Sequence, residues 1–171
     1  MTNLILTGMR GTGKTTLGKA LALYLRWDFV DLDEWIEEKS KKGVHELVMN
    51  EGWERFRALE KAAVRACDGL KKTVISTGGG TLIDEGNAKK LKANGLVILL
   101  VADMETMRKN LAQSHARPSL TNQTDPTNKS SALDELDAVW EDRRDRYHAI
   151  ADLVHDTTHG MDLDGLLEKL N

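Results

Sequence analysis

The sequence predicts an α/β protein built on one parallel sheet. Short apolar runs, rich in β-branched residues, alternate along the 171 residues with longer helical patterns, and this alternation is typical of parallel strands joined by helices. The length is close to that of one globular domain, which predicts a single domain over residues 1–171. The five expected strands are Leu4–Thr7, Phe29–Asp31, Thr73–Thr77, Val97–Val101 and Leu153–His155.

The helices between and after these strands are expected to cover both faces of the sheet. The first is predicted from about Lys14 to Arg26, because leucines recur there every four residues and form one apolar stripe. Asp84 and Asp162 are expected to cap the N-termini of two later helices. The other expected helices are Glu34–Lys41, Val44–Asn50, Trp53–Cys67, Glu85–Ala93, Glu105–Gln113, Leu133–Ile150 and Leu163–Leu170.

Residues 114–131 interrupt this pattern. The segment is rich in Ser, Thr, Asn and Asp and contains both prolines of the chain, Pro118 and Pro126. Such a stretch inside a compact domain is usually a functional loop or a linker. Because helical sequence and a strand still follow, we expect a lid rather than a domain boundary.

Charge, cysteine content and apolar runs exclude several classes of protein. Lys and Arg total 24 against 27 Asp and Glu, so there is no basic surplus of the kind that marks a nucleic-acid binder. The single cysteine, Cys67, excludes an internal disulfide and a Cys-rich zinc site, and we expect it to be a small helical residue. No apolar run is long enough for a signal peptide or a membrane span, so we expect a soluble, cytoplasmic protein.

The segment from Gly8 to Thr15 matches the pattern GxxxxGK[ST] and lies between a predicted strand and a predicted helix. In this setting backbone N–H groups and the helix N-terminus surround a β-phosphate. Lys14 is expected to reach the β- and γ-phosphates and the hydroxyl of Thr15 to ligate Mg²⁺. Residues 1–27 carry four basic side chains and no acidic one, which favours a nucleotide site over the alternative of a Gly-rich structural turn.

The acceptor is expected at the carboxyl ends of the strands, where open α/β sheets bind ligands. The second strand ends in Asp31 and Asp33, whose spacing points both carboxylates to the same side of the chain. The third strand ends in the glycine cluster Gly78 to Gly80. The helix from Trp53 carries Arg57 and Glu60.

Six short motifs follow one another along the chain. They are the GxxxxGK[ST] loop, Asp31-Leu32-Asp33, Phe56-Arg57-Ala58-Leu59-Glu60, Gly78-Gly79-Gly80, Arg117-Pro118-Ser119-Leu120, and Arg143 before Tyr147. Any one of them is weakly specific, whereas all six in this order are highly specific. In these motifs the sequence resembles the shikimate kinase family over essentially its whole length.

The resemblance implies a P-loop kinase fold with a substrate-binding region over residues 32–70 and a lid over 114–131. It implies that Asp33 binds shikimate hydroxyls and helps to take the proton from the attacking one, and that Asp31 lies near Mg²⁺ through water. Arg57, Arg143, Gly79 and Gly80 are implied to bind shikimate, and Lys14, Asp33 and Arg117 to act in catalysis. The nucleotide-binding residues expected are Gly11, Thr12, Gly13, Lys14, Thr15, Thr16, Arg117 and His159.

Structural alternatives stay open for several of these residues. Asp33 could cap a helix that starts at Glu34. Arg57 could be a surface arginine paired with Glu60 or Glu54, and Arg143 could pair with neighbouring acids on a solvated face. The three glycines could form a flexible turn.

The adenine side departs from the family pattern. Asn110 stands where an arginine often flanks adenine in the family, so stacking there is expected to be weaker or to involve Arg108. The loop after the last strand offers Thr157, Thr158 and His159 as further adenine neighbours.

The resemblance implies the ATP-dependent phosphorylation of the 3-hydroxyl of shikimate, giving shikimate 3-phosphate and ADP, within the chorismate pathway of aromatic amino-acid biosynthesis. The expected protein is monomeric and has Mg²⁺, ATP and shikimate as its ligands, with no nucleic acid or membrane partner. The alternatives are a related kinase acting on gluconate or a nucleoside monophosphate, and an inactive nucleotide-binding homologue.

Overall fold

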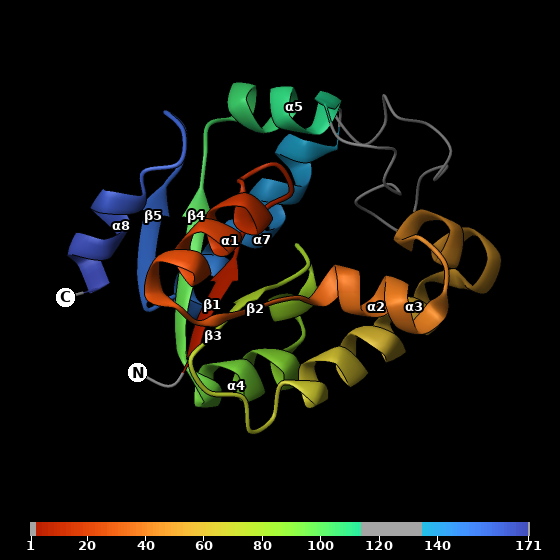
Figure 1. The fold of residues 1–171 in the computed structure, drawn as a ribbon. Helices are drawn as coiled ribbons and strands as arrows, with labels where there is room; N and C mark the ends of the chain where they lie inside the picture. Colours follow the sequence, from red (N-terminus) through yellow and green to blue (C-terminus); the bar gives the residue numbers. More distant parts are fainter. Residues whose placement is uncertain (1–2, 114–134, 171) are drawn as a thin grey trace.

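The computed structural model describes residues 3–113 and 135–170, which contain a five-stranded sheet in the order β2-β3-β1-β4-β5 (Figure 1). Every neighbouring pair of strands is parallel, so the predicted parallel sheet and its five strands are confirmed. The strands are β1 (Asn3–Thr7), β2 (Asp28–Asp31), β3 (Thr73–Ser76), β4 (Leu96–Val101) and β5 (Leu153–Asp156).

Helices lie on both faces of the sheet, as predicted (Figure 1). Along β1, Leu4 and Leu6 pack into a cluster with α1 and α8, whereas Ile5 packs into a cluster with α2, α3 and α4, as the alternation of side chains along a strand requires. The helices are α1 (Lys14–Leu25), α2 (Leu32–Ser40), α3 (Val44–Ala66), α4 (Glu85–Asn94), α5 (Met104–Gln113), α7 (Leu136–Ile150) and α8 (Leu163–Leu170), with a short 3₁₀ helix η1 (Thr81–Ile83).

Two boundaries differ from the sequence-based expectation. The helices predicted on either side of residue 52 form one element, α3, which is kinked at Gly52, where φ is 82° and ψ is 168°. The helix α2 begins at Leu32, because Asp31 caps it: the Asp31 Oδ1 accepts hydrogen bonds from the backbone N–H of Asp33 (3.0 Å) and of Glu34 (3.4 Å). The alternative in which Asp33 caps this helix is therefore wrong.

The other local predictions agree with the structure. Asp84 caps α4 by accepting from the N–H of Asn87 at 3.0 Å, and Asp162 accepts from the N–H of Gly165 at 2.9 Å. Cys67 is buried at the end of α3, and burial raises the pKa of its thiol to about 11. Within the described ranges, no helix is both long and apolar enough to cross a membrane.

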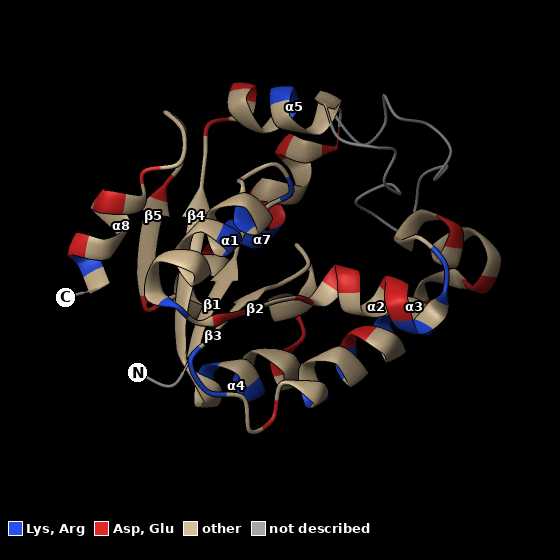
Figure 2. Cartoon of the chain, in the orientation of Figure 1, with Lys and Arg blue, Asp and Glu red and all other residues tan. Residues whose placement is uncertain are grey.

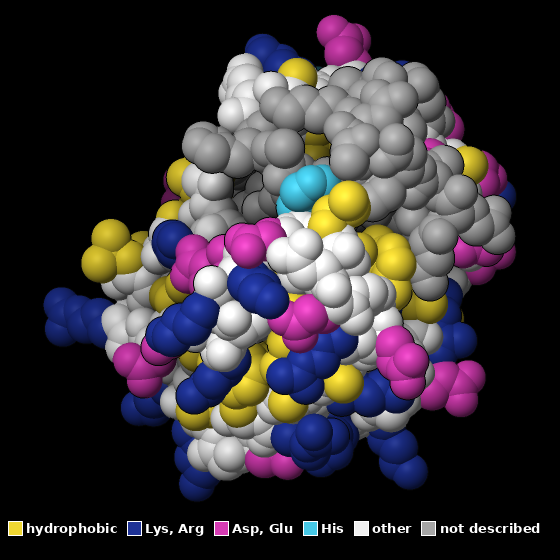
Figure 3. All heavy atoms as spheres, turned by 90° about the vertical axis from the view of Figure 1, so that its right-hand side faces the viewer, with side chains coloured by type: hydrophobic (Ala, Val, Ile, Leu, Met, Phe, Trp, Pro, Cys, Tyr) yellow, Lys and Arg dark blue, Asp and Glu magenta, His cyan; other side chains and the backbone are white. Residues whose placement is uncertain are grey.

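Charges of both signs are mixed on the face that α2 and α3 present (Figure 3). Ion pairs join these elements to their surroundings, among them Lys42–Glu51 at 2.5 Å and Lys61–Asp84 at 3.0 Å.

Candidate active site

The phosphate loop connects the end of β1 at Thr7 to the start of α1 at Lys14. Gly8, Gly11 and Gly13 have φ values of 137°, 82° and 84°, a backbone region that glycine enters at little cost. A Cβ atom on Gly11 would lie 2.6 Å from the carbonyl oxygen of Met107 on α5. Glycine is therefore required here both by the backbone conformation and by the close approach of α5.

Lys14 lies across this loop. Its Nζ donates to the carbonyl oxygens of Gly8 (3.0 Å) and Met9 (2.8 Å). Thr12 is held from both sides, since its hydroxyl donates to Met9 O at 2.8 Å and its carbonyl accepts from the Thr157 hydroxyl at 2.9 Å. The loop is thus fixed by hydrogen bonds from its own lysine and from the segment after β5.

Thr15 and Asp31 bring a hydroxyl and a carboxylate together beside the loop. The Thr15 Oγ1 donates to the Asp31 Oδ2 at 2.8 Å, and Asp31 is largely buried. Basic residues lie on the phosphate loop and at the start of α1, and acidic residues lie at the start of α2 (Figure 2). Hydroxyl and carboxylate oxygens are the ligands that Mg²⁺ prefers, so this pair fits a divalent cation.

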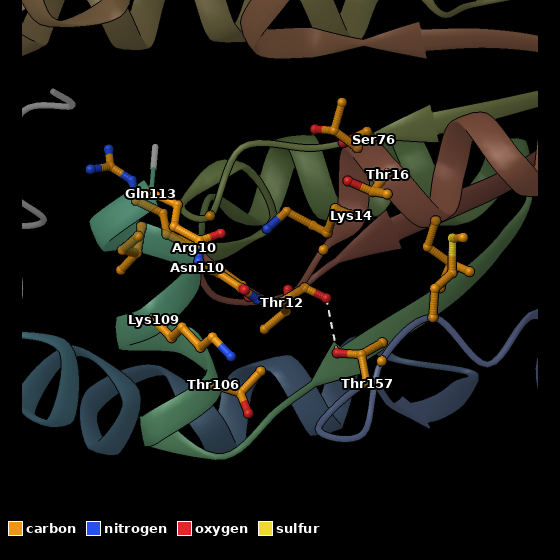
Figure 4. Close-up of a pocket in the computed structure, with 18 of the residues that line it drawn as sticks. Arg10, Thr12, Lys14, Thr16, Ser76, Thr106, Lys109, Asn110, Gln113 and Thr157 are labelled. Atoms are coloured by element: carbon orange, nitrogen blue, oxygen red, sulfur yellow. Dashed lines mark hydrogen bonds between the residues drawn. The ribbon is translucent and has the colours of Figure 1, made fainter. Parts of the chain in front are cut away.

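The larger cavity of the site has a volume of about 620 Å³ and opens over the phosphate loop. Its walls come from α1, α5 and the segment after β5 (Figure 4). Of the predicted nucleotide residues in the described ranges, all but His159 line it. Its lining includes Gly11, Thr12, Gly13, Lys14, Thr15, Thr16, Thr106, Lys109, Asn110, Gln113, Thr157 and Thr158.

Of the α5 residues that line the cavity, only Asn110 was expected there from the sequence. Thr106, Lys109, Asn110 and Gln113 line the cavity from this helix (Figure 4), and their spacing of three and four residues, which places them on one helical face, was the available signal. Besides lining the cavity, Asn110 donates a hydrogen bond from its Nδ2 to the carbonyl oxygen of Gly11 at 2.7 Å. It therefore ties α5 to the phosphate loop.

Two residues expected near adenine do not line the larger cavity. Arg108 pairs with Asp137 of α7 and does not line the cavity. His159 is also absent from the lining, although its neighbours Thr158 and Gly160 take part in it. Hydrogen bonds from Thr106, and to a lesser degree the nearby His159, lower the pKa of Asp103.

A second cavity of about 330 Å³ adjoins the first. It contains the predicted acceptor residues Arg57 and Arg143 together with the glycine cluster. The residues common to both cavities are Arg10, Thr15, Asp31, Asp33 and Gly79. The two cavities therefore meet beside the hydroxyl and carboxylate pair and at Asp33.

Arg57 is anchored in the smaller cavity by a buried carboxylate. Its Nη1 lies 2.6 Å from the Oε2 of Glu60, whose side chain is only 2% exposed, and the other Glu60 oxygen accepts from the Thr81 hydroxyl at 2.7 Å. The guanidinium carbon also lies 5.4 Å from the ring centre of Trp53. The pair with Glu60 exists as the helical spacing suggests; the Arg57 side chain is 37% exposed, whereas the Glu60 side chain is buried.

The glycines of the cluster leave room for these charged groups. A Cβ on Gly78 would lie 2.9 Å from the Asp33 Oδ1, and a Cβ on Gly80 would lie 2.9 Å from the Arg57 Nη2. The φ of Gly80 is −102°, a value open to other residues. Close approach to the site, rather than the freedom of a flexible turn, accounts for these two glycines.

Arg143 projects from α7 into the smaller cavity. The neighbouring Arg144 makes the surface pairs, with Glu141 at 3.2 Å and with Asp145 at 3.6 Å. Arg143 thus lines the same cavity as Arg57, and its role in binding the acceptor stays a prediction. Arg117 and the predicted lid over residues 114–131 lie outside the described residues.

Removing Arg57 is expected to lower stability, because the buried Glu60 carboxylate then loses its cation and keeps the hydrogen bond from Thr81. We expect Arg57→Ala to reduce the free energy of unfolding by about 1–3 kcal/mol. Urea unfolding followed by circular dichroism measures this change. The double variant Arg57→Ala/Glu60→Gln should regain most of the loss, since no buried charge is then left; a double variant less stable than Arg57→Ala would contradict the role given to Glu60.

The fold and the site define a P-loop kinase: a phosphate loop fills the floor of one cavity, and a second cavity with arginines adjoins it at a carboxylate. A family model for shikimate kinase matches residues 10–170. The chain belongs to the shikimate kinase family.

Individual relatives agree with this assignment. The chain is 36% identical over 161 residues to a shikimate kinase of Syntrophus aciditrophicus, covering 91% of this chain and 83% of the relative. It is 43% identical over 120 residues to one from Caldanaerobacter subterraneus, covering 70% of each. Among solved structures, the shikimate kinase of Acinetobacter baumannii in complex with shikimate superposes with a TM-score of 0.87 at 28% identity, covering 99% of this chain and 91% of that one.

Proposed function

We propose that this chain transfers the γ-phosphoryl group of ATP to the 3-hydroxyl of shikimate, giving shikimate 3-phosphate and ADP. The observation that carries the proposal is the meeting of the two cavities at Thr15, Asp31 and Asp33. ATP in the larger cavity and a small carboxylic acid in the smaller one would place phosphoryl donor and acceptor in contact. Family membership and the relatives named above support shikimate as that acid.

The residues of the smaller cavity suit a polyol acid. Arg57 and Arg143 would bind the carboxylate, for which the planar guanidinium is well shaped. The N–H groups of Gly79 and Gly80 would bind substrate oxygens. Asp33 would accept the proton of the 3-hydroxyl. At the same time the hydroxyl oxygen would bond to the γ-phosphorus of ATP, and the bond between this phosphorus and the oxygen that bridges it to ADP would break.

On the nucleotide side, Lys14 would neutralise charge on the β- and γ-phosphates, and Arg117 would add a second cation from the predicted lid. Thr15 would hold Mg²⁺ directly and Asp31 through water, as the donor types of this pair allow. When bound, Mg²⁺ supplies charge neutralisation on the phosphate oxygens.

An assay of ADP release tests the proposal. We expect turnover with shikimate and MgATP and little with gluconate or nucleoside monophosphates as acceptors. The absence of turnover at saturating shikimate would overturn the proposal, and ADP binding by calorimetry without transfer to any acceptor would indicate an inactive homologue.

We further propose that the protein is a monomer that acts in the cytoplasm, in the chorismate pathway. Sedimentation equilibrium tests whether it is a monomer.

Arg57→Ala is expected to impair the use of shikimate by about 10- to 100-fold in kcat/KM, because a charged hydrogen bond to the substrate is lost. The KM for ATP should stay near that of the wild type. Arg55→Ala is the matched control, because Arg55 lies on the same helix and pairs with Glu51 at the surface. Equal damage to the use of both substrates would show that Arg57 does not serve the acceptor.

A further inference from the structure

Tyr147 lies behind the acceptor cavity. Its side chain is fully buried near the end of α7, and it lines neither cavity. The ring stacks on Trp140 with a centroid distance of 6.3 Å, and its hydroxyl lies 3.9 Å from the sulfur of Met9. The residue thus sits between α7 and the phosphate loop without access to a ligand.

The Tyr147 hydroxyl connects two parts of the acceptor site that are remote in sequence. It donates a hydrogen bond to the carbonyl oxygen of Gly79 in the glycine cluster. The side chain of Arg143, one helical turn earlier, lies close enough to the same hydroxyl to lower its pKa. Because guanidinium groups only donate, the hydroxyl can accept from Arg143 while it donates to Gly79.

Burial raises the pKa of Tyr147, and nearby Arg143, Arg10 and Arg57 oppose that rise only in part. The hydroxyl therefore keeps its proton at neutral pH and can serve as a donor. The three arginines that lower its pKa all line the smaller cavity.

The bond to Gly79 also fixes the direction of the next N–H group. The peptide between Gly79 and Gly80 is planar and trans, so its carbonyl oxygen and its N–H point in opposite directions. With the carbonyl directed at buried Tyr147, the N–H of Gly80 points away from it. Gly80 lines the smaller cavity, and within residues 3–113 and 135–170 the N–H groups of Gly79 and Gly80 donate no backbone hydrogen bond.

We propose that Tyr147 is a positioning residue for the acceptor. Its hydroxyl fixes the position of the Arg143 guanidinium relative to the N–H group of Gly80. The inference rests on the proposed function, because it assumes that both groups bind shikimate. Tyr147 itself does not touch the substrate. Loss of the Tyr147 hydroxyl should therefore weaken the binding of shikimate and leave the binding of ATP unchanged.

Tyr147→Phe tests this role, because it removes one oxygen and keeps the ring. We expect the KM for shikimate to rise about tenfold or more, from the loss of hydrogen bonds that include a charged donor. The KM for ATP should stay within about twofold of that of the wild type, and kcat should fall less than the KM rises. Steady-state kinetics with each substrate varied in turn, and thermal unfolding of each variant, measure these effects.

Two control variants separate positioning from packing. Trp140→Phe loosens the packing around Tyr147 but keeps its hydroxyl, so it should lower Tm and leave the KM for shikimate unchanged. Tyr24→Phe removes an exposed hydroxyl on α1 and should change neither quantity. A rise in the KM for shikimate in Trp140→Phe equal to that in Tyr147→Phe would overturn the proposal.

A double-mutant cycle with Arg143→Ala tests the coupling itself. If Tyr147 acts partly through Arg143, Tyr147→Phe should raise the KM less in the Arg143→Ala background than in the wild type. An unchanged KM for shikimate in Tyr147→Phe, or equal rises for shikimate and ATP, would overturn the inference while the activity of the wild type stands. Failure of the wild type to phosphorylate shikimate would overturn the proposed function and this inference together.

Discussion

Asp33→Asn is expected to lower kcat for shikimate phosphorylation by about 10²- to 10⁴-fold, the contribution usual for a general base. Asp33 lies where the two cavities meet, and its Oδ1 lies close to Gly78 of the glycine cluster. Asparagine keeps the shape of the side chain and one acceptor oxygen, but its NH2 group donates and it cannot accept the proton. The fold should survive, because Asp31 and not Asp33 caps α2.

The effect on kcat is measured by ADP release at saturating ATP and shikimate, with Tm as the check on folding. Glu38→Gln is the control: it makes the same chemical change on the same helix, at an exposed residue that lines neither cavity. That variant should turn over at the wild-type rate. A near-normal kcat for Asp33→Asn would reduce Asp33 to a residue that only binds the substrate hydroxyls.

The sheet could be predicted from the sequence because its central strands are buried on both faces. All five residues of β1 and all four of β3 are buried. Buried strands contain short apolar runs that stand out against helical periodicity, such as Leu4–Leu6 in β1 and the whole of β4. The phosphate loop was equally accessible, since its glycine spacing is local. The residue that caps α2 was harder to predict, because Asp31 and Asp33 are both possible caps. The position of Asp31 beside Thr15, 16 residues earlier, depends on the tertiary fold.

The environment of the acceptor residues depends on contacts between remote segments. The spacing of Arg57 and Glu60 predicts an ion pair on one helical face, but only the contact of Glu60 with Thr81, 21 residues away, explains why that carboxylate is buried. The bond from Tyr147 to Gly79 spans 68 residues. Side-chain burial and contacts at such separations follow from how the elements pack, which local patterns do not specify.

Lys14→Met is expected to lower kcat/KM for ATP by about 10²- to 10³-fold, the loss usual when one donor to developing charge is removed. Methionine is similar to lysine in length, so the space is filled while the charge is lost. Lys14 also donates to Gly8 O and Met9 O, so the substitution removes two bonds that hold the phosphate loop. Both effects act on phosphate binding, whereas the smaller cavity does not include Lys14.

Because of this separation, Lys14→Met should still bind shikimate, which tryptophan fluorescence can report from Trp53 in the smaller cavity. Lys19→Met is the matched control, since Lys19 lies on the same helix and makes an exposed pair with Glu34, and such pairs contribute little to stability. It should leave both kcat/KM values and Tm close to those of the wild type. A kcat/KM for ATP in Lys14→Met equal to that in Lys19→Met would mean that the remaining cations of the larger cavity, Arg10 and Lys109 among them, neutralise the phosphates without Lys14.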